Sequence, residues 1–272
     1  MLDTLVLMLS QPFMQRAIVG GIFISLCASL LGVSLVLKRY SMIGDGLSHV
    51  GFGAVVVASA LGFAPLAVAI PVVVVAAFLL LRLGEASSIK GDAAVALVST
   101  GALAVGVIAS GLSGGMNQDF NSYMFGTILG LSESDVILSI AISVPVLILF
   151  VLFYNKIFAV TFDETFSKAT GVKAEMYNAL VAVLTALVIV LGMRLMGALL
   201  ISSLVIFPSL TSMRLCRTFK SVVICSGAVS VICLLSGICL SVLADTPTGA
   251  SIVVSNIVVF VIFWAVGKIK NR

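Results

Sequence analysis

Charged residues are scarce in this sequence, and their scarcity excludes most classes of soluble protein. Only 10% of the 272 residues are Asp, Glu, Lys or Arg, whereas 61% are apolar and the mean hydropathy is +1.29. A soluble domain of this size could not bury so much apolar surface. No charged tail, long polar stretch or low-complexity linker divides the chain. We therefore expect one polytopic membrane domain over residues 1–272, with 15–272 as the membrane bundle and 1–14 as a short extracytoplasmic segment.

The sequence also lacks the motifs of several enzyme classes. No G-x-x-x-x-G-K-[ST] motif occurs, so the chain has no P-loop with which to bind ATP. A single histidine, His49, excludes the H-E-x-x-H site of an intramembrane metallohydrolase. The five cysteines form no C-x-x-C pair and lie in or beside apolar runs, which is typical of small packing residues. We expect a protein that is not itself an enzyme and that draws energy from a partner or a gradient.

Apolar runs of membrane-spanning length dominate what is present. About 20 apolar residues are needed to cross roughly 30 Å of hydrocarbon, and the sequence offers eight or nine such runs. This predicts an all-α bundle of eight or nine transmembrane helices. The run at 197–214 could be broken or re-entrant, because Pro208 and several Ser and Thr residues interrupt it. The nine runs are approximately residues 17–37, 42–61, 65–82, 93–113, 136–154, 176–195, 197–214, 221–243 and 250–267.

The basic residues give a direction to these runs. With nine crossings and the N-terminus outside, thirteen of the fifteen basic residues fall in inner loops and only Arg16 and Arg194 lie outside. The positive-inside rule therefore favours an extracytoplasmic N-terminus and a cytoplasmic C-terminus. Because the basic residues are scattered over short loops, the net charge of +4 reflects topology and does not indicate nucleic-acid binding. The thirteen are Lys38, Arg39, Arg82, Lys90, Lys156, Lys168, Lys173, Arg214, Arg217, Lys220, Lys268, Lys270 and Arg272.

One segment, SMIGDGLSH at 41–49, places an aspartate and the only histidine inside an apolar run. Asp45 and His49 are four residues apart, so on a helix both side chains lie on one face. At 1.5 Å per residue from Ser41, Asp45 lies about 6 Å and His49 about 12 Å into the hydrocarbon, whose midplane is near 15 Å. Such a pair is costly in a membrane unless it has a function. We interpret it as half of a metal site.

Two structural explanations of this pair stay open at this point. Asp45 could cap the start of its helix, and His49 could form a hydrogen bond to a neighbouring helix. As a metal site, carboxylate and imidazole suit zinc, manganese and ferrous iron better than calcium or magnesium. Two protein ligands per subunit also suit an ion in transit, because tight four-ligand capture would stop its passage.

Small residues recur at intervals of four in the fourth run, at Ala102, Gly106, Ser110 and Gly114. This spacing lets helix backbones approach closely, which favours tight bundling in a membrane.

Acidic residues lie on the side expected to face outward, at Asp119, Glu133, Asp135 and Asp245. We expect them to be without basic partners, as solvated loop charges or as a surface that attracts cations.

The longest inner loop contains TFDETFSKATGV at 161–172, in which apolar and charged residues alternate at helical spacing. The pattern predicts a short amphipathic helix at the inner surface, which could contact a partner or lie on the membrane interface.

Five segments in order resemble the permease subunit of the bacterial ABC importers for zinc, manganese or iron. They cover nearly the whole chain, from about Phe13 to the last run. The segments are SMIGDGLSH, NSYMFGTILGLS at 121–132, TFDETFSKATGV, MGALLISSLVIFPSLTSMRL at 196–215 and ADTPTGAS at 244–251.

This resemblance implies a function and a set of partners. It implies a multi-pass protein of the bacterial inner membrane that passes a divalent metal through Asp45 and His49. The metal is then a transported substrate, with no permanently bound cofactor. It also implies a homodimer, two cytoplasmic ATP-binding subunits and an extracytoplasmic metal-binding protein, and no nucleic acid. The ATPase would meet a coupling segment that comprises Phe162, Asp163, Phe166, Ala169 and Gly171.

The most specific of these expectations is the identity of the transported metal. The amino-acid sequences at 44–49 and 245–249 resemble those of zinc members more closely, so zinc is the first expectation, with manganese or iron as alternatives. A gradient-driven secondary metal transporter is a further alternative, although it would typically show two repeated halves, and no such repeat is visible.

Overall fold

The computed structural model describes residues 10–86, 91–112, 126 and 132–270. Within them a helix covers each of the nine apolar runs. The long helices are α2 (Pro12–Leu37), α3 (Ile43–Ala60), α4 (Pro65–Ala86), α5 (Gly91–Leu112), α7 (Glu133–Leu152), α10 (Ala174–Met196), α11 (Ala198–Met213), α12 (Phe219–Ala244) and α13 (Thr248–Lys270), and two short helices, α8 (Tyr154–Phe162) and α9 (Glu164–Ala169), lie between α7 and α10.

Local sequence explains where several of these helices begin. α2 and α4 start at prolines, whose missing N–H is not needed in a first turn. Ser132 caps α7 and Thr218 caps α12, and each cap side chain accepts a hydrogen bond from the backbone N–H three residues on. The side chain of that third residue in turn accepts a hydrogen bond from the backbone N–H of the cap residue. Between α10 and α11, Gly197 adopts a φ of +89°, which an L side chain rarely tolerates. The sharp break at Gly197 is what separates the two helices.

Seven helices in the described part of the chain are long and apolar enough to cross a membrane. Two more apolar helices are shorter, over Pro65–Leu81 and Ala198–Met213. The 197–214 run, which could have been broken, contains the continuous helix α11 even though Pro208 lies inside it. Its 16 residues span about 24 Å, a little less than a bilayer core. The number of crossings, eight or nine, and the outward N-terminus stay predictions.

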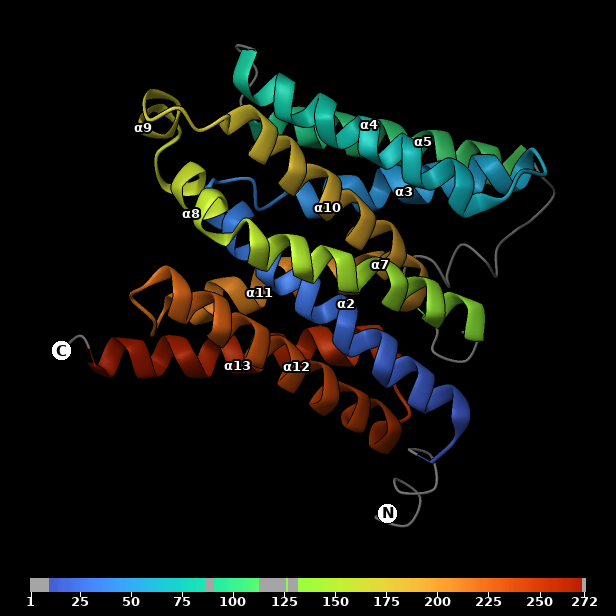
Figure 1. Ribbon diagram of the computed structural model, residues 1–272. Coiled ribbons are helices and arrows are strands. Elements are labelled where there is room, and N and C mark those ends of the chain that lie inside the picture. The colour runs from blue at the N-terminus through green and yellow to red at the C-terminus, as the bar shows by residue number, and fades with distance from the viewer. Residues whose placement is uncertain (1–9, 87–90, 113–125, 127–131, 271–272) are drawn as a thin grey trace.

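The helices form a layered bundle with their axes roughly aligned (Figure 1). α3, α4 and α5 pack together at one side, α12 and α13 at the other, and α2, α10 and α11 lie between them. The short helices α8 and α9 lie at the end of the bundle where α2 finishes, and α7 begins at the opposite end (Figure 1). We call these the α9 end and the α7 end.

Burial separates interior helices from peripheral ones. In α2, α3 and α10, 67–72% of the membrane-length window is buried, whereas in α5, α7 and α13 the share is 22–28%. The exposed faces of the peripheral helices are apolar, with residues such as Leu97, Ile137 and Val261. These faces suit contact with lipid tails or with another membrane subunit. The helix that carries Asp45 and His49 is therefore an interior one.

Close helix contacts depend on glycine. A Cβ added at Gly32 of α2 would lie 2.0 Å from the Val205 carbonyl oxygen of α11, and one at Gly53 of α3 would lie 2.5 Å from the Ala102 carbonyl oxygen of α5. In turn, a Cβ added at Gly106 of α5 would lie 3.0 Å from the Cα of Gly53. The small residues predicted to bring helices together do so at Ala102 and Gly106, whereas Gly114 lies outside the described residues.

We expect Gly32→Ala to destabilise the protein, because the new methyl group would push α2 and α11 apart. Overpacking of this kind lowers the free energy of unfolding by about 1–3 kcal/mol. Gly101→Ala is the matched control, since nothing lies within 4 Å of its added Cβ and a helical Gly→Ala change gains up to about 1 kcal/mol. Thermal unfolding in detergent measures both variants. Equal midpoints would contradict the close α2–α11 contact.

Candidate functional site

Asp45 and His49 turn toward each other on one face of α3. His49 Nε2 lies 3.6 Å from Asp45 Oδ2, beyond hydrogen-bonding distance but close enough for an electrostatic contact. The side chains are 41% exposed at Asp45 and 20% exposed at His49, although most of α3 is buried. The spacing of four residues thus places both groups at one point, as the sequence predicts.

The two structural explanations of this pair do not fit the described residues. The N-cap of α3 is Met42, and no side chain caps the helix there, so Asp45 is not a capping residue. His49 forms no hydrogen bond to a neighbouring helix in the described part of the chain, and its Nδ1 is buried without any partner there. A buried polar atom without a partner is rare in folded proteins and calls for a functional explanation. Among the described residues, neither the start of α3 nor a neighbouring helix thus accounts for the pair.

Neighbouring helices hold the flanks of this face closely. A Cβ at Gly46 would lie 2.6 Å from a Val95 methyl of α5, and one at Gly44 would contact Val205 of α11. At 100° per residue, Asp45 and His49 lie between these two flanks. Ser48 adds a polar link, because its Oγ lies 3.4 Å from Ser202 Oγ of α11. Close packing on both flanks fixes the rotation of α3 and so fixes where the two side chains point.

The separation of the two donor atoms suits a shared metal ion. An ion about 2.1 Å from each donor would hold them about 3.4 Å apart in tetrahedral geometry and about 3.0 Å apart at a right angle. The observed 3.6 Å is close to the tetrahedral value. No group of three or more His, Cys, Asp or Glu side chains that could hold a metal ion occurs among the described residues. Asp45 and His49 therefore have no third side chain of these types beside them in the described part of the chain.

The predicted coupling segment forms a second feature, at the α9 end. α8 and α9 meet at Asp163, whose carboxylate accepts a hydrogen bond of 2.8 Å from the Phe166 N–H and so caps α9. Phe162 and Phe166 are 60% and 64% exposed. Ala169 ends α9, and Gly171 follows it with a φ of +82°. The single short helix predicted over 161–172 is therefore divided at Asp163: Phe162 ends α8 and Phe166 lies in the six-residue α9. Both aromatic rings are on the surface, and the buried residue of α9 is Ser167.

Glu164 connects this segment to the bundle, and sequence reasoning did not identify it. Its carboxylate accepts a 2.9 Å hydrogen bond from Asn178 Nδ2 of α10, lies 2.9 Å from Lys168 Nζ and lies 3.6 Å from Lys38 Nζ. Desolvation alone would raise the pKa of Glu164, but the hydrogen bonds from Lys168 and Asn178 and the charges of Lys38 and Lys168 outweigh it. The pKa of Glu164 therefore lies below its ordinary value. Only the i, i+4 pair with Lys168 was visible in the sequence.

The acidic residues expected to be unpaired include two that are paired. Arg16 of α2 forms an ion pair with Glu133, and Arg194 of α10 forms one with Asp135 at 2.8 Å. The expectation was wrong for Glu133 and Asp135. Arg16 and Arg194, the two basic residues that do not lie in the predicted inner loops, are brought beside them by helix packing. Both pairs lie at the α7 end, and Asp119 lies outside the described residues.

Comparison with known proteins gives this geometry a context. A manganese transport system membrane protein of Halalkalibacterium halodurans is 28% identical over 246 residues, which cover 90% of this chain and 84% of that protein. A high-affinity zinc uptake system membrane protein of Haemophilus influenzae is 28% identical over 90% of this chain and 94% of that protein. A probable iron transport system membrane protein of the same organism is 30% identical over the full length of both chains.

A solved structure supports the same relationship at the level of the fold. PsaBC from Streptococcus pneumoniae in complex with Fab contains a chain that superposes with a TM-score of 0.87 and 27% identity, over 97% of this chain and 95% of that one. The family model described as "ABC 3 transport family" matches residues 10–267. Because this match extends over nearly the whole helical bundle, including α3 and the α8–α9 segment, the chain belongs to the ABC 3 transport family.

Proposed function

We propose that this chain is the membrane permease of an ATP-driven importer of a divalent transition metal, and that Asp45 and His49 bind the metal in transit. The observation that carries the proposal is a carboxylate and an imidazole 3.6 Å apart in the interior helix α3, with the imidazole Nδ1 buried without a partner. A pair of this kind inside a membrane helix is a functional site by default. The relatives named for manganese, zinc and iron transport support the class of substrate.

Zinc is the metal we propose first. Zinc is placed first because the sequences at 44–49 and 245–249 resemble zinc members more closely and because zinc is commonly held by imidazole and carboxylate donors. Manganese prefers six oxygen-rich ligands at right angles. Iron shares the mixed nitrogen and oxygen donors, so manganese and iron are the alternatives that the uptake measurement below distinguishes.

We also propose that two copies of the chain form the site together. One chain offers two donors, and the Asp45 carboxylate keeps 41% of its surface exposed on an otherwise buried helix. Exposure to lipid would be costly for a carboxylate, so a water-filled passage or a second subunit has to cover this face. A homodimer with the two α3 faces opposed would do so and would give an ion up to four exchangeable protein donors.

The energy source in this proposal is a pair of cytoplasmic ATP-binding subunits that bind the α8–α9 segment. Phe162 and Phe166 offer exposed aromatic surface, and the cap at Asp163 holds their relative orientation. Exposed aromatic residues dominate the binding energy of many protein interfaces. An extracytoplasmic metal-binding protein would deliver the ion at the α7 end, and the complex would reside in the bacterial inner membrane.

Loss of either metal donor should abolish uptake. In metal-limited cells, we expect Asp45→Asn and His49→Ala each to lower zinc accumulation at least about ten-fold, because one of only two donors per chain is lost. Ser59→Ala on the same helix is the control and should leave uptake unchanged. Elemental analysis of cells measures zinc, manganese and iron together. Normal accumulation of all three metals in both variants, with the protein inserted in the membrane, would refute the site.

Removal of an aromatic ring from α9 should weaken binding of the ATP-binding subunits. We expect Phe166→Ser to reduce their co-purification with the permease on the order of ten-fold, since a central aromatic residue commonly contributes about 2 kcal/mol or more. Met176→Ser is the control, because Met176 is also a largely exposed apolar residue, at 51% against 64% for Phe166, and lies near the start of α10. Uptake that continues without any ATP-binding subunit and follows a proton gradient would instead favour a secondary transporter.

A further inference from the structure

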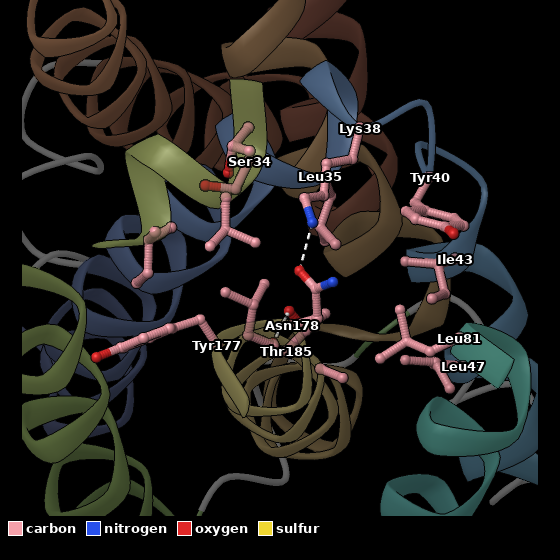
Figure 2. Close-up of a pocket in the computed structure, with 15 residues that line it drawn as sticks. Ser34, Leu35, Lys38, Tyr40, Ile43, Leu47, Leu81, Tyr177, Asn178 and Thr185 are labelled. Carbon is pink, nitrogen blue, oxygen red and sulfur yellow. Dashed lines mark hydrogen bonds between the residues drawn. The ribbon is translucent and has the colours of Figure 1, made fainter. Parts of the chain in front are cut away.

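Three side chains from three helices meet at the α9 end. Lys38, the C-cap residue directly after α2, donates a hydrogen bond from Nζ to Asn178 Oδ1 of α10. Asn178 donates through Nδ2 to Glu164 Oε2 of α9 at 2.9 Å, and Lys38 Nζ lies 3.6 Å from the same carboxylate oxygen. We call this cluster of Lys38, Glu164 and Asn178 the junction. Figure 2 shows the Lys38 amine and the Asn178 amide facing each other beside a cavity.

The turn after Lys38 connects the junction rigidly to α3. Arg39 adopts a left-handed φ of +63°, and the Tyr40 N–H donates to the Leu35 carbonyl at 2.9 Å, which closes the end of α2 as a Schellman motif. The Ile43 N–H then donates to the Tyr40 carbonyl at 3.1 Å as α3 begins. Only six residues separate Lys38 from Asp45, and the turn between the helices is held by backbone hydrogen bonds. A displacement of Lys38 therefore moves the first turn of α3.

On the other side of the junction, α9 has little apolar anchorage. Ser167 is its buried residue, and Phe166 is largely exposed. The carboxylate of Glu164 is the group through which α9 reaches both α2 and α10. Since ion pairs with hydrogen bonds to a third group have a defined geometry, the junction fixes α9 relative to the bundle more strongly than apolar contact does.

The cavity beside the junction leaves space for it to move. Lys38, Asn178 and Ser34 line it, together with Tyr40, Ile43 and Leu47 from the turn and the start of α3 (Figure 2). Its volume is about 20 Å³, enough for roughly one water molecule. The Ser34 hydroxyl is buried in the wall and has no partner among the described residues. A water molecule in the cavity would satisfy it, so the cavity offers a polar position beside the junction.

We propose that the junction of Lys38, Glu164 and Asn178 couples the α9 segment to the metal-binding helix α3, so that movement of α9 by the ATP-binding subunit is transmitted to Asp45 and His49. The three act as positioning residues and do not touch the metal. Coupling between distant sites is carried by contiguous packed and hydrogen-bonded elements, and the junction joins the two features of this chain that way. This inference rests on the proposed function.

The test is the ratio of metal transported to ATP hydrolysed. The permease, purified with the ATP-binding subunits that accompany it, is placed in liposomes with Zn²⁺ and Mn²⁺ assayed in parallel. We expect Glu164→Gln and Lys38→Gln each to lower this ratio about five-fold or more, the low end of typical coupling effects, while ATP hydrolysis continues. A purely structural role would lower transport and hydrolysis together.

Matched variants make the result specific to the junction. Glu175→Gln makes the same substitution at a largely exposed glutamate near Lys168 and should leave the ratio unchanged. Lys38→Arg should retain most coupling, and the exchange of charges in Lys38→Glu with Glu164→Lys should restore part of what either single change loses. Lys38→Gln leaves α9 unaltered, so it decides the question if Glu164→Gln prevents assembly.

Two outcomes are distinguishable. A Glu164→Gln or Lys38→Gln complex with the same ratio as Glu175→Gln would overturn the inference and leave the proposed function intact. A wild-type complex that moves neither metal with ATP would overturn the proposed function itself.

Discussion

The cost of placing a carboxylate and an imidazole inside a membrane is the constraint on which the rest of this structure depends. Charged and polar groups are unfavourable in hydrocarbon unless an ion, water or a partner compensates for lost hydration. Asp45 and His49 face each other, yet neither is satisfied by a neighbouring helix in the described residues. In the proposed transit site, a cation would supply the compensation that the described residues lack.

Close packing around α3 makes that arrangement specific. Gly46 and Gly53 bring α5 against one flank, and Gly44 brings α11 against the other, so α3 cannot rotate without a clash. Protein interiors resist such displacement because they are densely packed. The position of the two donors therefore depends on residues that have no polar chemistry of their own.

The α9 end of the bundle shows a different balance of forces. There α9 is held to the bundle through polar groups, with Glu164 stabilised in its charged form by Lys168, Asn178 and Lys38. The preceding helix α8 packs through the buried side chains of Ile157 and Val160. These polar contacts have a defined geometry and little apolar area, whereas the interior helices are held by dense apolar contact.

Much of this could be predicted from the sequence, because the membrane imposes simple rules on it. In the part of the chain that the structure describes, the apolar runs placed the nine long helices, and the i, i+4 spacing brought Asp45 and His49 together. The small residues Ala102 and Gly106 indicated a close helix contact. These are local patterns set by the period of a helix. Only the tertiary structure decided that Lys38, Glu164 and Asn178 meet, and that Glu133 and Asp135 have basic partners. Such contacts join residues of different helices, from 14 positions apart for Glu164 and Asn178 to 140 for Lys38 and Asn178, and no local periodicity encodes them. They follow from how the helices pack.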